Sequence, residues 1–285
     1  MARVALVVHP SRPEAAKLAA EAVQWLTERG HSAVLSPTDA AGAGLVEVEL
    51  APEAELVDRA DLAMSLGGDG TMLRTVDLAC RAGVPVLGVN LGQLGYLSAV
   101  EPARVTEALE RFVAGDYSIE ERFTLEVHVG TGGGRRRLSA VNEAVLEKTV
   151  PGHTVRLGVA IAGEHFITYA ADGLIVATPT GSTAYNLSAR GPILSPQLRA
   201  VLVTPVSPHM LFDRSLVLAE GETVRVEVLE PRPAILVVDG TDAGVLEPGD
   251  AIECTTGPCP ARFVTFGGRP GFHAILKAKF GLSDR

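Results

Sequence analysis

Hydrophobic and polar positions follow one rhythm over the first 120 residues and another rhythm after them. Short apolar runs such as Val4–Val8, Asp61–Leu66 and Val84–Val89 are typical of strands buried on both faces of a sheet. Between the first two runs, apolar residues recur at intervals of three and four and predict a helix over residues 13–29, which Gly30 ends. Alternating strands and helices predict a parallel sheet with helices on its faces.

The same periodicity predicts further helices over residues 71–82 and around residues 105–113. Residues 36–52 are rich in Ala, Gly, Pro and Glu, which is typical of an exposed connection. We therefore expect an α/β domain over residues 1–120.

Later in the chain, apolar residues alternate with polar ones, as in Phe123–Val129, Val155–Ile161 and, more weakly, Phe263–Phe266. A period of two predicts half-buried antiparallel strands. We expect a mostly antiparallel, β-sandwich-like domain over residues 121–270. The apolar tail, residues 271–285, is expected to pack back on the first domain.

Charge, cysteines and hydropathy narrow the class of protein. The 285 residues include 25 Lys and Arg against 34 Asp and Glu, a net charge of −9 with no long basic run, so a nucleic-acid partner is not expected. Three cysteines fit neither a disulfide framework nor the paired ligands of a structural zinc site. No apolar stretch is long enough for a signal peptide or a membrane helix, so we expect a cytoplasmic protein without a membrane partner.

The segment Gly67-Gly-Asp-Gly70 lies where a predicted strand ends and a predicted helix begins. Ligands of open parallel sheets bind at this edge, where glycines and a helix start expose backbone N–H groups to a phosphate. Asp69 adds a carboxylate to an anion site, which suits a proton-transfer role or a metal ion; a tight turn capped by Asp69 is the alternative. Arg74, one turn further, could face the same anion or be solvated.

Two other polar motifs interrupt apolar surroundings. Residues 178–188, Thr-Pro-Thr-Gly-Ser-Thr-Ala-Tyr-Asn-Leu-Ser, follow a short apolar strand and offer many donors to a polar ligand. Local turns of Ser and Thr would account for part of this composition. Asn142-Glu143 stands in an apolar stretch, and on a strand its two side chains would point to opposite faces, with an edge strand as the alternative.

Together Gly67–Gly70, Asn142-Glu143 and Thr178–Ser188 resemble the NAD kinase family in order and approximate spacing. The resemblance covers nearly the whole chain. It implies transfer of the γ-phosphoryl group of ATP to the 2′-hydroxyl of the adenosine ribose of NAD+, giving NADP+. It also implies a divalent metal ion (Mg2+ or Mn2+) that arrives with ATP, no dedicated metal site, and a homodimer or homotetramer.

The resemblance makes Asp69 the general base and Gly67, Gly68 and Gly70 the phosphate loop. The residues it implies for nucleotide binding are Asp69, Gly70, Arg74, Asn142, Glu143, His153, Asp172, Thr183, Ala184, Tyr185, Asn186, Leu187 and Ser188. In one departure, Thr241 stands where many family members have Gln. The residues do not distinguish ATP from polyphosphate as donor, or NAD+ from NADH as acceptor.

Two other function classes remain open at this point. A lipid kinase of the same broad superfamily would explain Gly67–Gly70 but not Thr178–Ser188. A non-catalytic nucleotide sensor would keep the pocket and would not require Asp69, which is present here.

Overall fold

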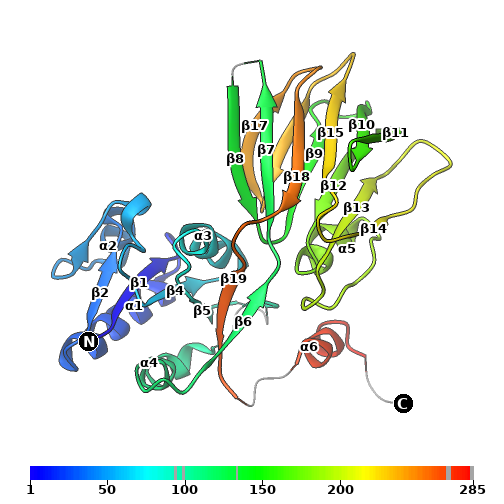
Figure 1. Cartoon of the computed structure of the whole chain (residues 1–285). Coiled ribbons are helices and arrows are strands. Elements are labelled where there is room, and N and C mark those ends of the chain that lie inside the picture. The colour runs from blue at the N-terminus through cyan, green and yellow to red at the C-terminus, as the bar shows by residue number, and fades with distance from the viewer. Residues whose placement is uncertain (93–94, 98–99, 133, 268–270, 283–285) are drawn as a thin grey trace. The chain divides into compact units, whose positions relative to one another are not determined.

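The contacts of the chain divide it into two units, each with its own sheets (Figure 1). The first unit joins residues 1–121 to residues 261–285, and the second comprises residues 122–260. The computed structural model describes residues 1–92, 95–97, 100–132, 134–267 and 271–282.

The first unit is built on a seven-stranded sheet in the order β3-β2-β1-β4-β5-β19-β6. Its strands are β1 (Arg3–Val8), β2 (Ser32–Leu35), β3 (Glu49–Leu50), β4 (Leu62–Gly67), β5 (Val86–Asn90), β6 (Ser118–Arg122) and β19 (Ala261–Thr265). All neighbours from β3 to β19 pair in parallel, which confirms the predicted sheet. The winding reverses between β1 and β4, and the carboxyl ends of two such strands form the usual ligand-binding crevice.

The first unit also contains helices. They are α1 (Pro13–Glu28), α2 (Pro37–Ala43), α3 (Asp69–Cys80), α4 (Val105–Val113) and α6 (Phe272–Lys279), with short 3-10 turns η1 (Glu53–Glu55) and η2 (Pro102–Arg104). Leu62, Met64 and Leu66 of β4 share one core with α1 and α4. Because side chains alternate along a strand, Ala63 and Ser65 point to the opposite face, where α3 packs. No helix in the described ranges is long and apolar enough to cross a membrane.

Two segments of this unit differ from the sequence-based expectation. Residues 36–52 contain α2 and β3 and are not simply an exposed connection. Ser36 caps α2 by accepting the Asp39 N–H, and Pro37 occupies the first turn; this start signal was hidden by the Ala- and Gly-rich composition.

The second difference concerns Phe263–Phe266, which the weak alternation assigned to the β-rich domain. The strand β19 instead pairs in parallel with β5, between Phe263 and Val86. The second unit accordingly ends at Pro260, not near residue 270, and α6 clusters with the first unit. A strand buried on both faces carries no polar alternation, so periodicity alone could not assign β19 to either sheet.

The second unit contains two six-stranded antiparallel sheets. One has the order β11-β10-β15-β18-β7-β8 and the other β14-β13-β12-β9-β16-β17. The strands of the first are β7 (Leu125–Thr131), β8 (Gly134–Ala140), β10 (Val155–Ile161), β11 (Glu164–Ala171), β15 (Val224–Leu229) and β18 (Ala251–Thr256). Those of the second are β9 (Glu143–Lys148), β12 (Gly173–Ala177), β13 (Ala200–Val206), β14 (Leu216–Ala219), β16 (Ala234–Val238) and β17 (Thr241–Leu246).

The two sheets of the second unit pack face to face. Val127 and Val129 of β7 lie in one buried core with Leu174 and Val176 of β12, and these strands belong to different sheets. This confirms the two packed sheets predicted from the period of two. Between β12 and β13 the chain forms a 3-10 turn, η3 (Gly181–Thr183), and a short helix, α5 (Tyr185–Ser188).

Candidate functional site

The phosphate loop of the first unit connects the fully buried strand β4 to α3. The helix begins at Asp69, with Gly68 in an extended conformation before it. The N-cap residue, Gly68, has no side chain to cap this helix, so its first turn presents backbone N–H groups that a ligand could use.

The glycines of the loop have two different roles. A Cβ atom at Gly67 would lie 2.2 Å from Thr71 Oγ1, so the turn from strand to helix is too tight for a side chain. At Gly68 and Gly70 a Cβ atom would meet no atom within 4 Å. Those two positions leave the backbone bare toward open space, as close approach of a phosphate requires.

Asp69 projects from the start of α3 with an exposed side chain. Among the described residues, its carboxylate has no hydrogen bond or ion pair that would engage it. The protein around it still desolvates the carboxyl and raises its pKa, while the ammonium group of Lys279 lowers that pKa in part. Asp69 therefore offers a carboxylate that is free to accept a hydrogen bond from a ligand.

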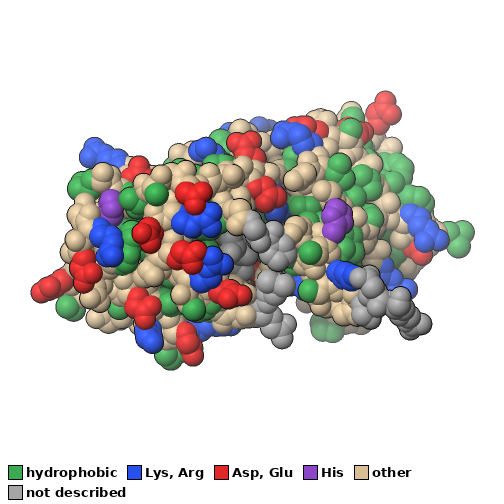
Figure 2. Space-filling model, turned by 90° about the horizontal axis from the view of Figure 1, so that it is seen from below, with side chains coloured by type: hydrophobic (Ala, Val, Ile, Leu, Met, Phe, Trp, Pro, Cys, Tyr) green, Lys and Arg blue, Asp and Glu red, His purple; other side chains and the backbone are tan. Residues whose placement is uncertain are grey.

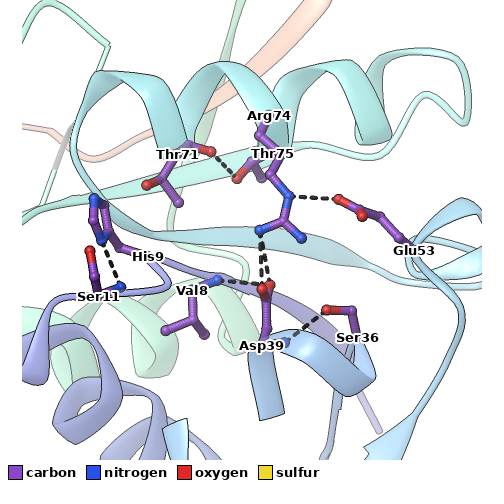
Figure 3. A network of polar contacts seen from close by, with 9 residues as sticks. All are labelled: Val8, His9, Ser11, Ser36, Asp39, Glu53, Thr71, Arg74 and Thr75. Atoms are coloured by element: carbon purple, nitrogen blue, oxygen red, sulfur yellow. Dashed lines mark hydrogen bonds and ion pairs between the residues drawn. The ribbon is translucent and has the colours of Figure 1, made fainter. Parts of the chain in front are cut away.

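Arg74 lies one turn further along α3, where it joins two acidic side chains (Figure 3). Its Nη1 lies 3.1 Å from Asp39 Oδ1, and its Nε lies 2.6 Å from Glu53 Oε1. The Asp39 side chain is only 2% exposed and also accepts the Val8 N–H at 3.1 Å. Arg74 thus compensates a buried charge that links β1, α2 and α3; its contact with a nucleotide stays a prediction.

In the second unit, Asn142 and Glu143 stand at a turn that one carboxylate organises. Asp239 accepts the backbone N–H groups of Val141, Asn142 and Glu143 at 2.7, 2.8 and 3.0 Å. The Asp239 N–H in turn donates to the Glu143 carbonyl at 3.0 Å. Four hydrogen bonds therefore fix the backbone at the start of β9.

The hydroxyl-rich loop packs against this same turn. Thr178 donates its N–H to the Asn142 carbonyl at 2.8 Å and its hydroxyl to the Val141 carbonyl. A Cβ atom at Gly181 would lie 2.1 Å from the Asn142 oxygen, so only glycine fits there. The structure brings these two predicted motifs together at one end of the second sheet, where β9 and β12 are neighbours.

Glu143 is buried, with 7% of its surface exposed. Burial, together with the negative charge of Asp239, raises its pKa to about 8, although the Tyr185 backbone N–H donates to it and lowers the pKa. Its Oε2 is buried and has no hydrogen-bond partner in the described residues. A protonated, partly unsatisfied carboxyl at neutral pH can donate a hydrogen bond to a ligand.

Some predicted binding residues are already engaged within the protein. Asn186 is fully buried: its Nδ2 donates to the carbonyls of Ser182 and Pro192, and its Oδ1 accepts from the Thr204 hydroxyl. Its side chain therefore fixes the loop, and its contact with a nucleotide stays a prediction.

Other predicted residues remain more accessible. Asp172 forms an ion pair with Lys148, with Nζ 2.6 Å from Oδ1 and both side chains about one-third exposed. His153 and Ser188 are exposed, whereas Thr183, Ala184, Tyr185 and Leu187 are half-buried. Thr241, the departure from the family pattern, is the exposed first residue of β17.

Sequence reasoning missed the roles of Asp39 and Asp239. Asp239 precedes Gly240 between two apolar runs, and this is a recognisable turn signal. Its carboxylate accepts hydrogen bonds from Val141–Glu143, about a hundred residues earlier in the chain. No local sequence pattern indicates this contact.

The surface of the molecule carries charged side chains of both signs (Figure 2). On the face drawn in Figure 2, Lys and Arg side chains are interspersed with Asp and Glu over much of the surface. Within the described ranges, no three His, Cys, Asp or Glu side chains gather as a metal site.

Comparison with known proteins identifies the family. Residues 4–117 match the ATP-NAD kinase N-terminal domain, and residues 141–266 match the ATP-NAD kinase C-terminal domain. The chain belongs to the NAD kinase family. The resemblance seen in its motifs is thereby confirmed.

Full-length NAD kinases and solved structures agree with this assignment. The NAD kinase of Heliobacterium modesticaldum is 40% identical over 284 residues, which cover 98% of each chain. That of Moorella thermoacetica is 38% identical and covers 98% of this chain and 89% of its own. Yeast NADH kinase in complex with NADH superposes with a TM-score of 0.91 at 27% identity, over 100% of this chain and 89% of its own.

An NAD kinase from Archaeoglobus fulgidus in complex with ATP has a TM-score of 0.75 at 23% identity, which shows the shared fold. It covers 98% of this chain and 97% of its own. The arrangement of one parallel and two antiparallel sheets is thus that of NAD kinases.

Proposed function

We propose that this NAD kinase family member transfers the γ-phosphoryl group of ATP to the 2′-hydroxyl of the adenosine ribose of NAD+, with Asp69 as the general base. Membership of the family makes it an enzyme that phosphorylates NAD+. The donor, the acceptor oxygen and the role of Asp69 are the proposed part. The observation that carries them is an unengaged carboxylate at the start of a helix that no side chain caps.

The chemistry suits a carboxylate at this place. A ribose hydroxyl is far too weak an acid to ionise by itself near neutral pH. In the loose transition state of phosphoryl transfer, the attacking oxygen needs its proton removed only late, so orientation matters more than basicity. Asp69 accepts the hydroxyl proton, the oxygen attacks the γ-phosphorus, and ADP leaves with the bond electrons. The raised pKa of the Asp69 carboxyl, caused by desolvation, makes this group a better proton acceptor.

Contacts to the nucleotides are proposed on the same basis. The bare backbone at Gly68 and Gly70 would accommodate phosphates, and Mg2+ or Mn2+ carried by ATP would neutralise their charge. Asn142, Glu143 and Asp172 would contact NAD+, as would the accessible residues from Thr183 to Ser188 and the exposed His153. The orphaned Glu143 Oε2 supports this, because a buried polar atom without a partner suits a ligand.

The assembly and cellular location are also proposals. A homodimer or homotetramer is expected from the resemblance, and a cytoplasmic location from the short apolar runs of the sequence. Light scattering on the purified chain would measure the subunit number.

The test is turnover of NAD+ with Mg-ATP, with NADP+ measured by an NADP-specific dehydrogenase. We expect Asp69→Asn to lose turnover by about 10²–10⁴-fold while NAD+ still binds, because general-base catalysis contributes about that much. Asp77→Asn, an exposed carboxylate two turns along the same helix, is the matched control and should stay near wild type. Turnover with polyphosphate in place of ATP shows which phosphoryl donor is used. Turnover with NADH in place of NAD+ shows which acceptor is used.

Two outcomes would contradict the proposal. Near-normal turnover in Asp69→Asn with weakened NAD+ binding would make Asp69 a binding residue. Absence of NADP+ with either donor would favour the nucleotide sensor.

A further inference from the structure

The C-terminal helix α6 contacts the loop that follows β5. The Phe272 ring packs on the Tyr96 ring with centroids 6.0 Å apart, at the first turn of the helix. At its last residue, Lys279 Nζ lies 4.3 Å from the centroid of the same Tyr96 ring. Both ends of α6 are thus held on one aromatic side chain.

The Tyr96 segment belongs to the same edge of the sheet as the phosphate loop. It lies between Asn90 and Val100, and the Asn90 N–H donates to the Val100 carbonyl at 2.9 Å, so both ends of the segment meet beside β5. The next residue after β5, Leu91, donates its N–H to the Gly67 carbonyl at 3.0 Å. Leu91 is thus hydrogen-bonded to the phosphate loop, and Tyr96, five residues later, contacts Lys279.

The position of Lys279 near the loop has an electrostatic consequence. Its ammonium group is close enough to the Asp69 carboxylate to lower the pKa of Asp69. The Lys279 side chain is exposed, and it makes no salt bridge to any described residue. By contrast, the guanidinium of Arg74 on α3 is occupied by Asp39 and Glu53.

We propose that Lys279 is a phosphate-binding residue of the ATP site, positioned by the packing of Phe272 and Lys279 on Tyr96. The proposal rests on ATP as the donor of the proposed function. Polyphosphate groups of ATP crowd negative charge against the Asp69 carboxylate, and a lysine nearby offsets this repulsion. A compact ammonium on a flexible stem suits this task, because it can follow the phosphates as their charge moves.

The experiment measures binding of Mg-ATP and of NAD+ by calorimetry to the full chain and to three variants. We expect Lys279→Ala to weaken Mg-ATP binding about tenfold or more, since hydrogen bonds to charged groups are typically worth that much. Binding of NAD+ and of adenosine should stay within about twofold. Lys279→Arg, which keeps the charge, should recover most of the Mg-ATP affinity.

Lys277→Ala is the matched control, because Lys277 is in the same turn of α6 but a different direction around the helix. We expect its Mg-ATP affinity to stay within about twofold of wild type. In steady-state turnover, Lys279→Ala should raise the KM for ATP and leave the KM for NAD+ unchanged.

An unchanged Mg-ATP affinity in Lys279→Ala overturns the proposal, and so does an equal loss of NAD+ affinity. A shifted pH profile at unchanged ATP affinity would likewise overturn it and assign Lys279 to tuning Asp69. Failure of the proposed function is distinguishable: the wild type would then bind Mg-ATP in a Lys279-dependent way and still form no NADP+.

Discussion

Two carboxyl groups in the two units show how surroundings set the chemistry of a single residue. Asp69 and Glu143 both have raised pKa values, and desolvation is the main cause for both. Asp69 is exposed and has a cation nearby, whereas Glu143 is buried next to a second negative charge. We therefore expect Glu143, with its pKa of about 8, to be largely protonated at neutral pH, whereas the cation near Asp69 favours the charged form of that carboxyl.

Glu143 gives a prediction on stability against pH. Because the folded pKa of about 8 lies above the ordinary value of 4.5, its contribution is fully present below about pH 4.5 and is lost as pH rises toward 8. Glu143→Gln removes this loss, so the variant should become more stable relative to wild type as pH rises. The difference is on the order of 1.4 kcal/mol for each unit by which the pKa is raised.

Urea unfolding between pH 5 and pH 9, without nucleotide, measures this difference. Glu164→Gln, at an exposed position that starts β11, corrects for the change in net charge. Parallel stability curves for wild type and Glu143→Gln would show that the buried carboxyl ionises normally.

At the scale of elements, one side chain joins strands that are distant in sequence. Asp239, in the turn between β16 and β17, holds the backbone that starts β9. Its φ of 47° is left-handed, which Asp tolerates better than most residues. The turn from Val141 to Glu143 is thus set from outside its own strand.

We predict that Asp239→Asn destabilises the protein and weakens NAD+ binding. An amide has one acceptor oxygen in place of two and no charge, so at least one of three backbone N–H groups loses a partner, at a cost of about 1–3 kcal/mol. Thermal unfolding should show the loss, and the KM for NAD+ should rise more than kcat falls.

Asp242→Asn is the control for this prediction, because Asp242 is an exposed residue of β17 that, among the described residues, accepts only the local Gly244 N–H. It should change neither quantity by more than a small amount. If Asp239→Asn lowered kcat alone, the Asp239 carboxylate would have a catalytic role that its hydrogen bonds with backbone N–H groups do not suggest.

The sequence predicted elements best where a periodic pattern was long. The parallel sheet, α1, α3 and the two antiparallel sheets followed from period and from strand–helix alternation. The pairing of β19, the cap of α2 by Ser36 and the reach of Asp239 depend on tertiary contacts, which no local window contains. The site motifs could be found by residue type. The hydrogen bonds and ion pairs that Arg74 and Asn186 make within the protein also depend on tertiary contacts.

At the scale of the whole molecule, the chain leaves the first unit, forms the second unit and then returns to the first unit. The first sheet takes its sixth strand, β19, from residues that follow the entire second unit. Phe263 and Val264 of this strand are buried in the first unit. The first unit is therefore incomplete without the end of the chain.

Truncation tests this arrangement. A chain ending at Pro260 lacks β19 and should lose about 10 °C or more in the Tm of the first unit, because two buried side chains are worth roughly 1.5–3 kcal/mol each. A chain ending at Gly267 keeps β19 and lacks α6, which buries Ile275, so it should lose less in Tm than the chain ending at Pro260. Calorimetry and circular dichroism report both values; equal Tm values for the two truncated chains would contradict the role of β19.

The same feature orders events during synthesis. A ribosome adds about 5–20 residues per second, so the strands of the second unit leave it while β19 is still unmade. Until β19 emerges, β5 lacks the parallel strand that pairs with it at Val86, and this part of its edge is exposed. The half of the enzyme that is made first is the half that is finished last, and it needs protection from wrong pairing during that interval.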